Sequence, residues 1–188
     1  MKLTKTGRTL LIGANIWYFG EGMMGPLFAV FAEKVGGNIL DITWAWATYL
    51  VITGLLYIVA GRLLNNKNYK EKVIVVGYAL NALFTFSYLF VSSPLELFLV
   101  QAGLGMAEAI GTPAWDALYA KNLNEGMDSY AWGLSTGQSQ IVTGIAFGMG
   151  GLITHFASFE ALFITMGLIQ VAAALFTAQL LFVKNKKA

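Results

Sequence analysis

Long apolar stretches separated by short polar segments dominate the chain. Each stretch has the length of about 20 residues that a helix needs to cross the hydrocarbon core of a bilayer. The breaks between the stretches are too short to separate domains, so we expect one all-α membrane domain over residues 1–188. The pattern predicts six transmembrane helices, at Leu10–Lys34, Ile42–Ala60, Val73–Val91, Leu95–Ala120, Tyr130–Thr154 and Phe159–Val183.

The composition agrees with a membrane protein. Of the 188 residues 57% are hydrophobic and only 12% are charged, whereas about a quarter of the residues of a soluble domain are charged. The chain has no cysteine, which excludes disulfides, thiolate metal sites and cysteine nucleophiles. The net charge of +2 is too small to indicate nucleic-acid binding. No phosphate loop or metal-ligand cluster occurs in the sequence, so we expect no cofactor and no metal.

Lysine and arginine predict the orientation, because cytoplasmic segments collect these side chains. If the N-terminus lies inside, only Lys34 falls on the outer side. The inner segments then hold Lys2, Lys5, Arg8, Arg62, Lys67, Lys70, Lys72, Lys121, Lys184, Lys186 and Lys187. We therefore expect a multi-pass protein with both termini in the cytoplasm, and our hypothesis for its location is a prokaryotic plasma membrane.

The two halves of the chain resemble each other. A glutamate followed by a proline at the same spacing occurs in the first and fourth predicted helices, and a similar tetrapeptide occurs in the second and fifth. These matches are Glu21 with Pro26, Glu108 with Pro113, and Val51–Gly54 with Ile141–Gly144. Since each half has an odd number of helices, the second half enters the membrane from the opposite side. This predicts an inverted repeat of about residues 9–91 and 95–183, which is typical of secondary transporters.

Several glycine-rich segments carry a family resemblance. They are Gln101-Ala-Gly-Leu-Gly105, Gly111-Thr-Pro-Ala114, Gly144–Gly151 and the loop Gly61–Lys70. With these segments the chain resembles one six-helix half of a major facilitator superfamily transporter, over nearly its whole length. In the loop, Asn65 stands where the family has an acidic residue and Asn68 stands where it has a glycine. The resemblance implies a cytoplasmic gate around Gly61, Arg62, Asn65 and Lys70, to which we add Asp116 near Lys121 as a gate or interface contact.

Ordinary members of that family have twelve helices. Because the chain begins at Met1 and ends on a basic tail, we expect a half-size transporter that works as a parallel homodimer. Six spans put both termini on one side, so the two-fold axis would lie along the membrane normal, as between the halves of the full-length family. A fragment of a longer chain is the alternative.

Two carboxylates fall where charge is costly. Glu21 and Glu108 each lie about 18 Å from the nearer end of their predicted helices, near the midplane of the bilayer. A carboxylate there costs on the order of 2.5–3.5 kcal/mol and usually faces a cavity or a partner. Burial disfavours the charged form, so both are candidates for proton coupling. The structural alternative is a protonated glutamate bonded to a backbone carbonyl or to a neighbouring amide.

Other polar and aromatic residues are candidates for the substrate cavity or for helix packing. The cavity candidates are Asn15, Trp17, Tyr18, Trp115, Gln138 and Gln140. The candidates for close helix approach are the small-residue pairs Gly133 with Gly137 and Gly144 with Gly148. Aromatic rings beside an acidic group suit a cationic amphipath, through cation–π contact.

We therefore predict a secondary active transporter that works by alternating access, coupled to protons and exporting cationic or amphipathic small molecules. The alternatives are an uptake transporter for a neutral solute, and a non-transporting scaffold or subunit. A rival from another class is an intramembrane serine protease, because Gly133–Gly137 matches Gly-x-Ser-x-Gly around Ser135. The sole histidine, His155, lies about 30 Å further along the same predicted helix. A serine nucleophile needs a base within hydrogen-bond reach, so we expect no enzyme.

Overall fold

The computed structural model describes residues 3–123, 126 and 128–182. The regular elements in this part of the chain are all helical, which confirms the all-α class. They are α1 (Lys5–Gly22), α2 (Leu27–Lys34), α3 (Ile39–Leu64), α4 (Lys70–Ser87), the 3₁₀ helix η1 (Tyr88–Phe90), α5 (Pro94–Lys121), α6 (Asp128–Phe156), α7 (Phe159–Thr177) and the 3₁₀ helix η2 (Ala178–Phe182). The predicted end of the last span at Val183 lies outside the described residues, as do Lys2, Lys184, Lys186 and Lys187.

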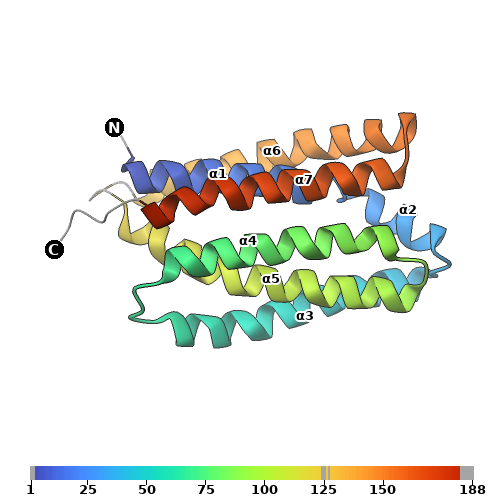
Figure 1. Cartoon of the computed structure of the whole chain (residues 1–188), viewed down its shortest axis with the longest axis horizontal. Coiled ribbons are helices and arrows are strands. Elements are labelled where there is room, and N and C mark those ends of the chain that lie inside the picture. The colour runs from blue at the N-terminus through green and yellow to red at the C-terminus, as the bar shows by residue number, and fades with distance from the viewer. Residues whose placement is uncertain (1–2, 124–125, 127, 183–188) are drawn as a thin grey trace.

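The long helices lie side by side with their axes nearly parallel (Figure 1). The start of α1, the α3–α4 loop and the end of α5 lie at one end of the bundle, while α2 and the α6–α7 turn lie at the other. All the described lysines and arginines except Lys34 therefore gather at the first end, here called the basic end. They are Lys5, Arg8, Arg62, Lys67, Lys70, Lys72 and Lys121. The cytoplasmic location of this end stays a prediction.

The first predicted span is not one helix. Helix α1 ends at Gly22 and α2 begins after Pro26, with a turn between them. Proline has no backbone N–H to continue the helical ladder, and the side-chain-free Gly22 and Gly25 fit against α6 at this turn. The prediction of a continuous helix over Leu10–Lys34 was thus wrong in its middle, directly after Glu21.

Four helices of the described part are long and apolar enough to cross a membrane. They are Ile39–Leu64, Lys70–Phe90, Pro94–Lys121 and Phe159–Phe182. These four agree with the second, third, fourth and sixth predicted spans. The first span is interrupted, and α6 carries a run of polar residues from Ser135 to Gln140 that lowers its hydropathy. For these two segments, crossing the membrane stays a prediction.

The helices pack in two sets that are joined to each other. Helix α1 packs against α6 and α7, whereas α5 packs against α3 and α4, and α4 and α7 join the two sets. Close approach depends on glycines at several of these contacts. A Cβ on Gly77 of α4, for instance, would lie 2.7 Å from the Cα of Gly111 on α5, so only glycine fits at residue 77 without movement of the helices.

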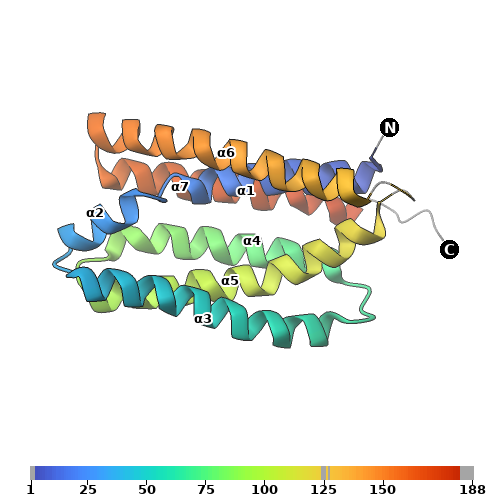
Figure 2. The ribbon, with the colours of Figure 1, turned by 180° about the vertical axis from the view of Figure 1, so that it is seen from behind.

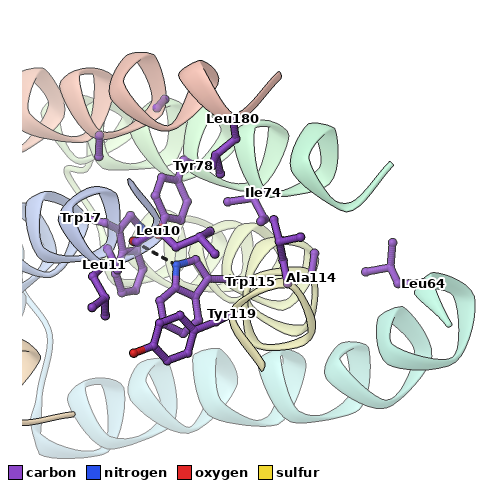
Figure 3. Packing of buried hydrophobic residues seen from close by; sticks show 14 of the residues in the cluster. Leu10, Leu11, Trp17, Leu64, Ile74, Tyr78, Ala114, Trp115, Tyr119 and Leu180 are labelled. Atoms are coloured by element: carbon purple, nitrogen blue, oxygen red, sulfur yellow. Dashed lines mark hydrogen bonds between the residues drawn. The ribbon is translucent and has the colours of Figure 1, made fainter. Parts of the chain in front are cut away.

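Two apolar clusters make the core. The cluster toward the basic end joins α1 and α5 through Leu10 and Trp115, and the indole N–H of Trp115 donates a 3.2 Å hydrogen bond to the carbonyl oxygen of Leu10 (Figure 3). The cluster toward the other end joins α2, α5 and α7 around Phe31, Leu97 and Phe163. Between these clusters lie the polar residues that form the candidate site.

Candidate functional site

Two adjoining cavities lie between the two sets of helices. The first has a volume of about 280 Å³ and is lined by α1, α4, α5 and α6. The second has a volume of about 330 Å³ and extends from α1 and α5 to α2, α3 and α7. Both cavities are lined by Trp17, Tyr18, Glu108, Ser139 and Gln140. The two cavities therefore share one wall in the middle of the bundle.

The charged side chains around these cavities are all acidic. Glu108 lines both cavities, Asp116 lines the first and Glu21 lines the second. No lysine, arginine or histidine of the described residues lines either one. Carboxylates inside a protein attract cations more strongly than carboxylates in bulk water. The region is therefore suited to a positively charged ligand or to protons.

Glu108 is held by two tyrosines of α3. The hydroxyl of Tyr57 donates a 3.3 Å hydrogen bond to Oε1 of Glu108, and the hydroxyl of Tyr49 donates one to Oε2. The tyrosines lie about two helical turns apart, so α3 holds the carboxylate from both ends. Charge-assisted hydrogen bonds of this kind position a side chain well, and Glu108 is thereby fixed at the junction of the two cavities.

Glu21 has a different environment. Its Oε2 accepts a single 3.5 Å hydrogen bond from Nδ2 of Asn81 on α4, at the upper limit for such a bond. The helix ends one residue later, so Glu21 sits at the break of the first span. The two carboxylates predicted as a pair thus differ: Glu108 has two hydroxyl donors, whereas Glu21 has one distant amide.

Aromatic rings complete the walls. Trp17 and Tyr18 of α1 form an edge contact with ring centroids 4.9 Å apart, and Trp17 also stacks on Tyr78 at 6.1 Å. Trp115 and Trp132 add a further pair across α5 and α6, with centroids 6.4 Å apart. Rings of this kind beside carboxylates provide the two contacts that recognise organic cations.

Comparison with known protein families matches residues 10–188 to the family described as Major Facilitator Superfamily. The chain belongs to the Major Facilitator Superfamily. The match covers nearly the whole chain and confirms the resemblance found in the glycine-rich segments. A separate comparison with curated proteins finds no match.

Membership in the superfamily makes the chain a multi-pass membrane protein whose family carries out secondary transport of small molecules and not enzyme chemistry. The expectation of a non-enzyme is therefore confirmed. The geometry agrees: Ser135 lines the first cavity, whereas His155 is exposed near the far end of α6. No histidine of the described residues lines that cavity.

Four of the six residues predicted for the substrate cavity line a cavity in the structure. Trp17, Tyr18 and Gln140 line both cavities and Trp115 lines the first. Asn15 and Gln138 line neither. Instead Nδ2 of Asn15 donates a 2.9 Å hydrogen bond to Oε1 of Gln138, which joins α1 to α6. This bond favours a role in helix packing, and a role of the two amides in binding substrate stays a prediction.

The gate candidates separate into two groups. Gly61, Arg62 and Asn65 are exposed at the end of α3, and Nζ of Lys70 donates a 2.7 Å hydrogen bond to the carbonyl oxygen of Lys67 in the α3–α4 loop. Asp116 lines the first cavity, as Glu108 does, and no described residue of the loop lines that cavity. A role of these residues in a gate stays a prediction.

The four candidate packing glycines face open space. A Cβ on Gly133, Gly137, Gly144 or Gly148 would meet nothing within 4 Å in the described chain. Within one chain, α6 uses Gly150 for close approach instead, against the backbone of Met23. These glycine pairs therefore contact no other helix of the described chain. Their use in packing against a second copy stays a prediction.

Sequence reasoning missed the partners of the carboxylates. Tyr49, Tyr57 and Asn81 carry the hydrogen bonds to Glu108 and Glu21, whereas the sequence favoured the nearby amides of α1 and α6. One signal was present, since Asn81 is the single amide in an otherwise apolar span. Such a residue usually faces the interior of a bundle, and Asn81 is only 2% exposed.

Proposed function

We propose that the chain is a secondary active transporter that works as a parallel homodimer by alternating access. The face formed by α3 and α6 supports the second copy. These two helices lie in front in Figure 2, with α4 and α7 behind them. Helix α3 is the least buried of the four candidate spans, and α6 presents its glycines to open space. A partner on this face would close the two cavities.

The packing pattern supports an inverted repeat as the basis of alternating access. An inverted repeat would make α1 equivalent to α5, α3 equivalent to α6, and α4 equivalent to α7. The contact between α1 and α7 is then equivalent to the contact between α5 and α4. The contact of α1 with α6 corresponds in the same way to that of α5 with α3. All four of these contacts are present. Two equivalent halves packed in opposite senses can exchange their inner and outer arrangements by rocking.

The acidic lining of the cavities carries the proposal for coupling and substrate. Three carboxylates and no basic side chain surround the space among the described residues. We assign proton coupling to Glu21 and Glu108, which would load and release protons as each access state exposes them. The same charge, with Trp17 and Tyr18 on both cavities, favours export of cationic or amphipathic small molecules.

Transport by the purified chain in proteoliposomes tests this function. Ethidium serves as an aromatic cation, a pH gradient drives it, and valinomycin with potassium holds the membrane potential at zero. With the wild-type chain we expect ethidium to cross the membrane in the direction opposite to the flow of protons. With Glu21→Gln or Glu108→Gln we expect this transport to stop. Glu33→Gln is the matched control, because Glu33 is an exposed carboxylate of α2 outside both cavities.

Each contrary outcome has a definite meaning. Wild-type rates in both Glu21→Gln and Glu108→Gln would show that neither carboxylate couples transport to protons. Uptake of a neutral solute without ethidium transport would favour the neutral-solute alternative. An absence of both transport and thermal stabilisation across a broad ligand panel would favour a non-transporting scaffold.

A further inference from the structure

Two buried oxygen atoms of α4 have no hydrogen-bond partner in the described chain, and both belong to residues near Glu21 or its cavity. Asn81 and Thr85 are one helical turn apart and are 2% and 1% exposed. Within the described chain, Oδ1 of Asn81 and Oγ1 of Thr85 make no hydrogen bond. Buried polar atoms are nearly always satisfied, and leaving one unpaired costs about 1–3 kcal/mol. Six such atoms occur in the described chain, and these two share one face of α4, where a ligand could satisfy both.

Thr85 differs in this respect from several other threonines of the helices, although Thr154 and Thr177 also lack a partner. Thr43, Thr48 and Thr165 each donate their hydroxyl to a backbone carbonyl one turn earlier, which is the usual way in which a helical threonine satisfies itself. Thr85 makes no such bond. Of the three threonines without a partner, Thr85 is the one that lines the second cavity.

A carboxylate completes the group. Glu21 lines the same cavity as Thr85, and its Oε2 lies 3.5 Å from Nδ2 of Asn81. Turning the Asn81 amide by half a rotation would exchange its nitrogen and oxygen. The unpartnered Oδ1 would then lie at about that distance from the carboxylate. Oxygen ligands about 2.3–2.6 Å from a cation, as around Ca²⁺, are separated by about 3.4 Å when they subtend a right angle.

We propose that Glu21, Asn81 and Thr85 form a sodium site. Carboxylate, amide and hydroxyl oxygens are the hard ligands that such cations prefer, and the radius of Na⁺ is close to that of Ca²⁺. A single carboxylate neutralises a monovalent ion. Among the described residues no three His, Asp or Glu side chains gather to hold a metal of higher charge. Sodium binding also gives the two unpartnered oxygens of α4 a partner, while the turned amide of Asn81 gives up the long hydrogen bond from its Nδ2 to Glu21.

The inference deepens the proposed function and rests on it only for access from water to the second cavity. Sodium binds the ionised carboxylate, so sodium and the coupling proton occupy Glu21 in turn. The other titratable side chains on this cavity are Tyr18, Tyr49, Tyr88 and Glu108. Glu108 takes its hydrogen bonds from Tyr49 and Tyr57, which leaves Glu21 as the carboxylate available to the ion.

Thermal unfolding of the purified full chain in detergent at pH 8 tests the site without any transport. The chain is titrated with NaCl, KCl, methylammonium chloride or choline chloride, with choline keeping the ionic strength constant. We expect stabilisation by sodium above the other salts, its loss in Glu21→Gln, and a sodium affinity reduced by at least about tenfold in Thr85→Val. Losses of about 10–100-fold follow removal even of outer contacts at metal sites.

Two further variants separate a ligand from a merely structural hydroxyl. Thr85→Ser keeps the oxygen and should keep the sodium effect. Thr177→Val is the matched control, because Thr177 is also 1% exposed with an unpartnered Oγ1 but lies against Gly13, outside both cavities. Because its hydroxyl has no partner to lose, this variant should keep or gain stability and keep the response to sodium.

Three results would overturn the sodium site: equal stabilisation by sodium and choline, a wild-type sodium response in Thr85→Val, or a stronger response to methylammonium than to sodium. The last result would assign these oxygens to an ammonium group of the substrate. The proposed function fails differently, through absence of ethidium transport in proteoliposomes. Proton-driven ethidium transport in sodium-free buffer with no sodium stabilisation would leave the transporter standing and remove this site.

Discussion

Gly150 of α6 packs directly on the backbone of Met23, in the turn that breaks the first span. A Cβ added at Gly150 would overlap the carbonyl oxygen of Met23 and lie 3.0 Å from its Cα. The broken helix that carries Glu21 is thus held in place by a glycine of the other half of the chain. This contact leads to the first prediction.

Gly150→Ala should separate α6 from the turn and destabilise the chain by about 1–3 kcal/mol, the usual cost of overpacking. The next residue is the matched control, because a Cβ on Gly151 would meet nothing within 4 Å. Gly151→Ala should be neutral or slightly stabilising, since alanine favours the helix. Free energies of unfolding in mixed micelles measure both variants, and equal values for the two would refute the contact.

The hydrogen bond between Asn15 and Gln138 leads to a prediction about stability rather than binding. A double-mutant cycle with Asn15→Ala and Gln138→Ala should give a coupling energy of about 0.6 kcal/mol, the average for polar contacts between membrane helices. Because neither residue lines a cavity, ethidium affinity should stay unchanged. Weaker ethidium binding with no coupling energy would return the two amides to the substrate site.

The tyrosines of α3 should matter for cation binding through Glu108. Tyr57→Phe removes the 3.3 Å hydrogen bond to Oε1 of Glu108 and leaves the ring in place. We expect ethidium affinity, measured by quenching of tryptophan fluorescence, to fall by about threefold to tenfold, in line with about 1 kcal/mol for one hydrogen bond. Tyr69→Phe is the control, because Tyr69 is exposed in the α3–α4 loop outside both cavities. An unchanged affinity in Tyr57→Phe would mean that α3 does not position Glu108.

The homodimer can be tested with cysteine pairs, since the chain has no cysteine of its own. Leu50 of α3 and Ile145 of α6 are 54% and 55% exposed and lie at similar depths in two helices that run in opposite directions. In native membranes, copies that carry Leu50→Cys should form disulfides with differently tagged copies that carry Ile145→Cys. The control pair is Leu83→Cys with Leu168→Cys, both 59% exposed on α4 and α7.

Cross-linking through the α3 and α6 pair alone would identify the proposed dimer face. Equal cross-linking through both pairs would indicate random collision. Monomers alone, across several α3–α6 pairs, would mean that a different chain covers this face or that the sequence is half of a longer protein.

The sequence by itself determined the fold class, most of the long helices and the positions of the charged residues along them. Apolar stretches of membrane-spanning length fix helices wherever they occur, because a backbone in lipid must satisfy its own hydrogen bonds. The spacing of Glu21 and Glu108 from the helix ends places both at similar depth, where charge is costly enough to mark a site. The glycine-rich segments were sufficient to identify the family to which the chain belongs.

The tertiary structure decided which side chains meet. Contacts of Glu108 with Tyr57, of Glu21 with Asn81 and of Asn15 with Gln138 each join residues more than 50 positions apart. Such partners depend on the rotation of each helix about its axis, and an apolar span with little amphipathic contrast does not specify that rotation. The same is true of the break after Glu21: Gly22, Gly25 and Pro26 permit it, but the packing of Gly150 against Met23 fixes where the chain turns.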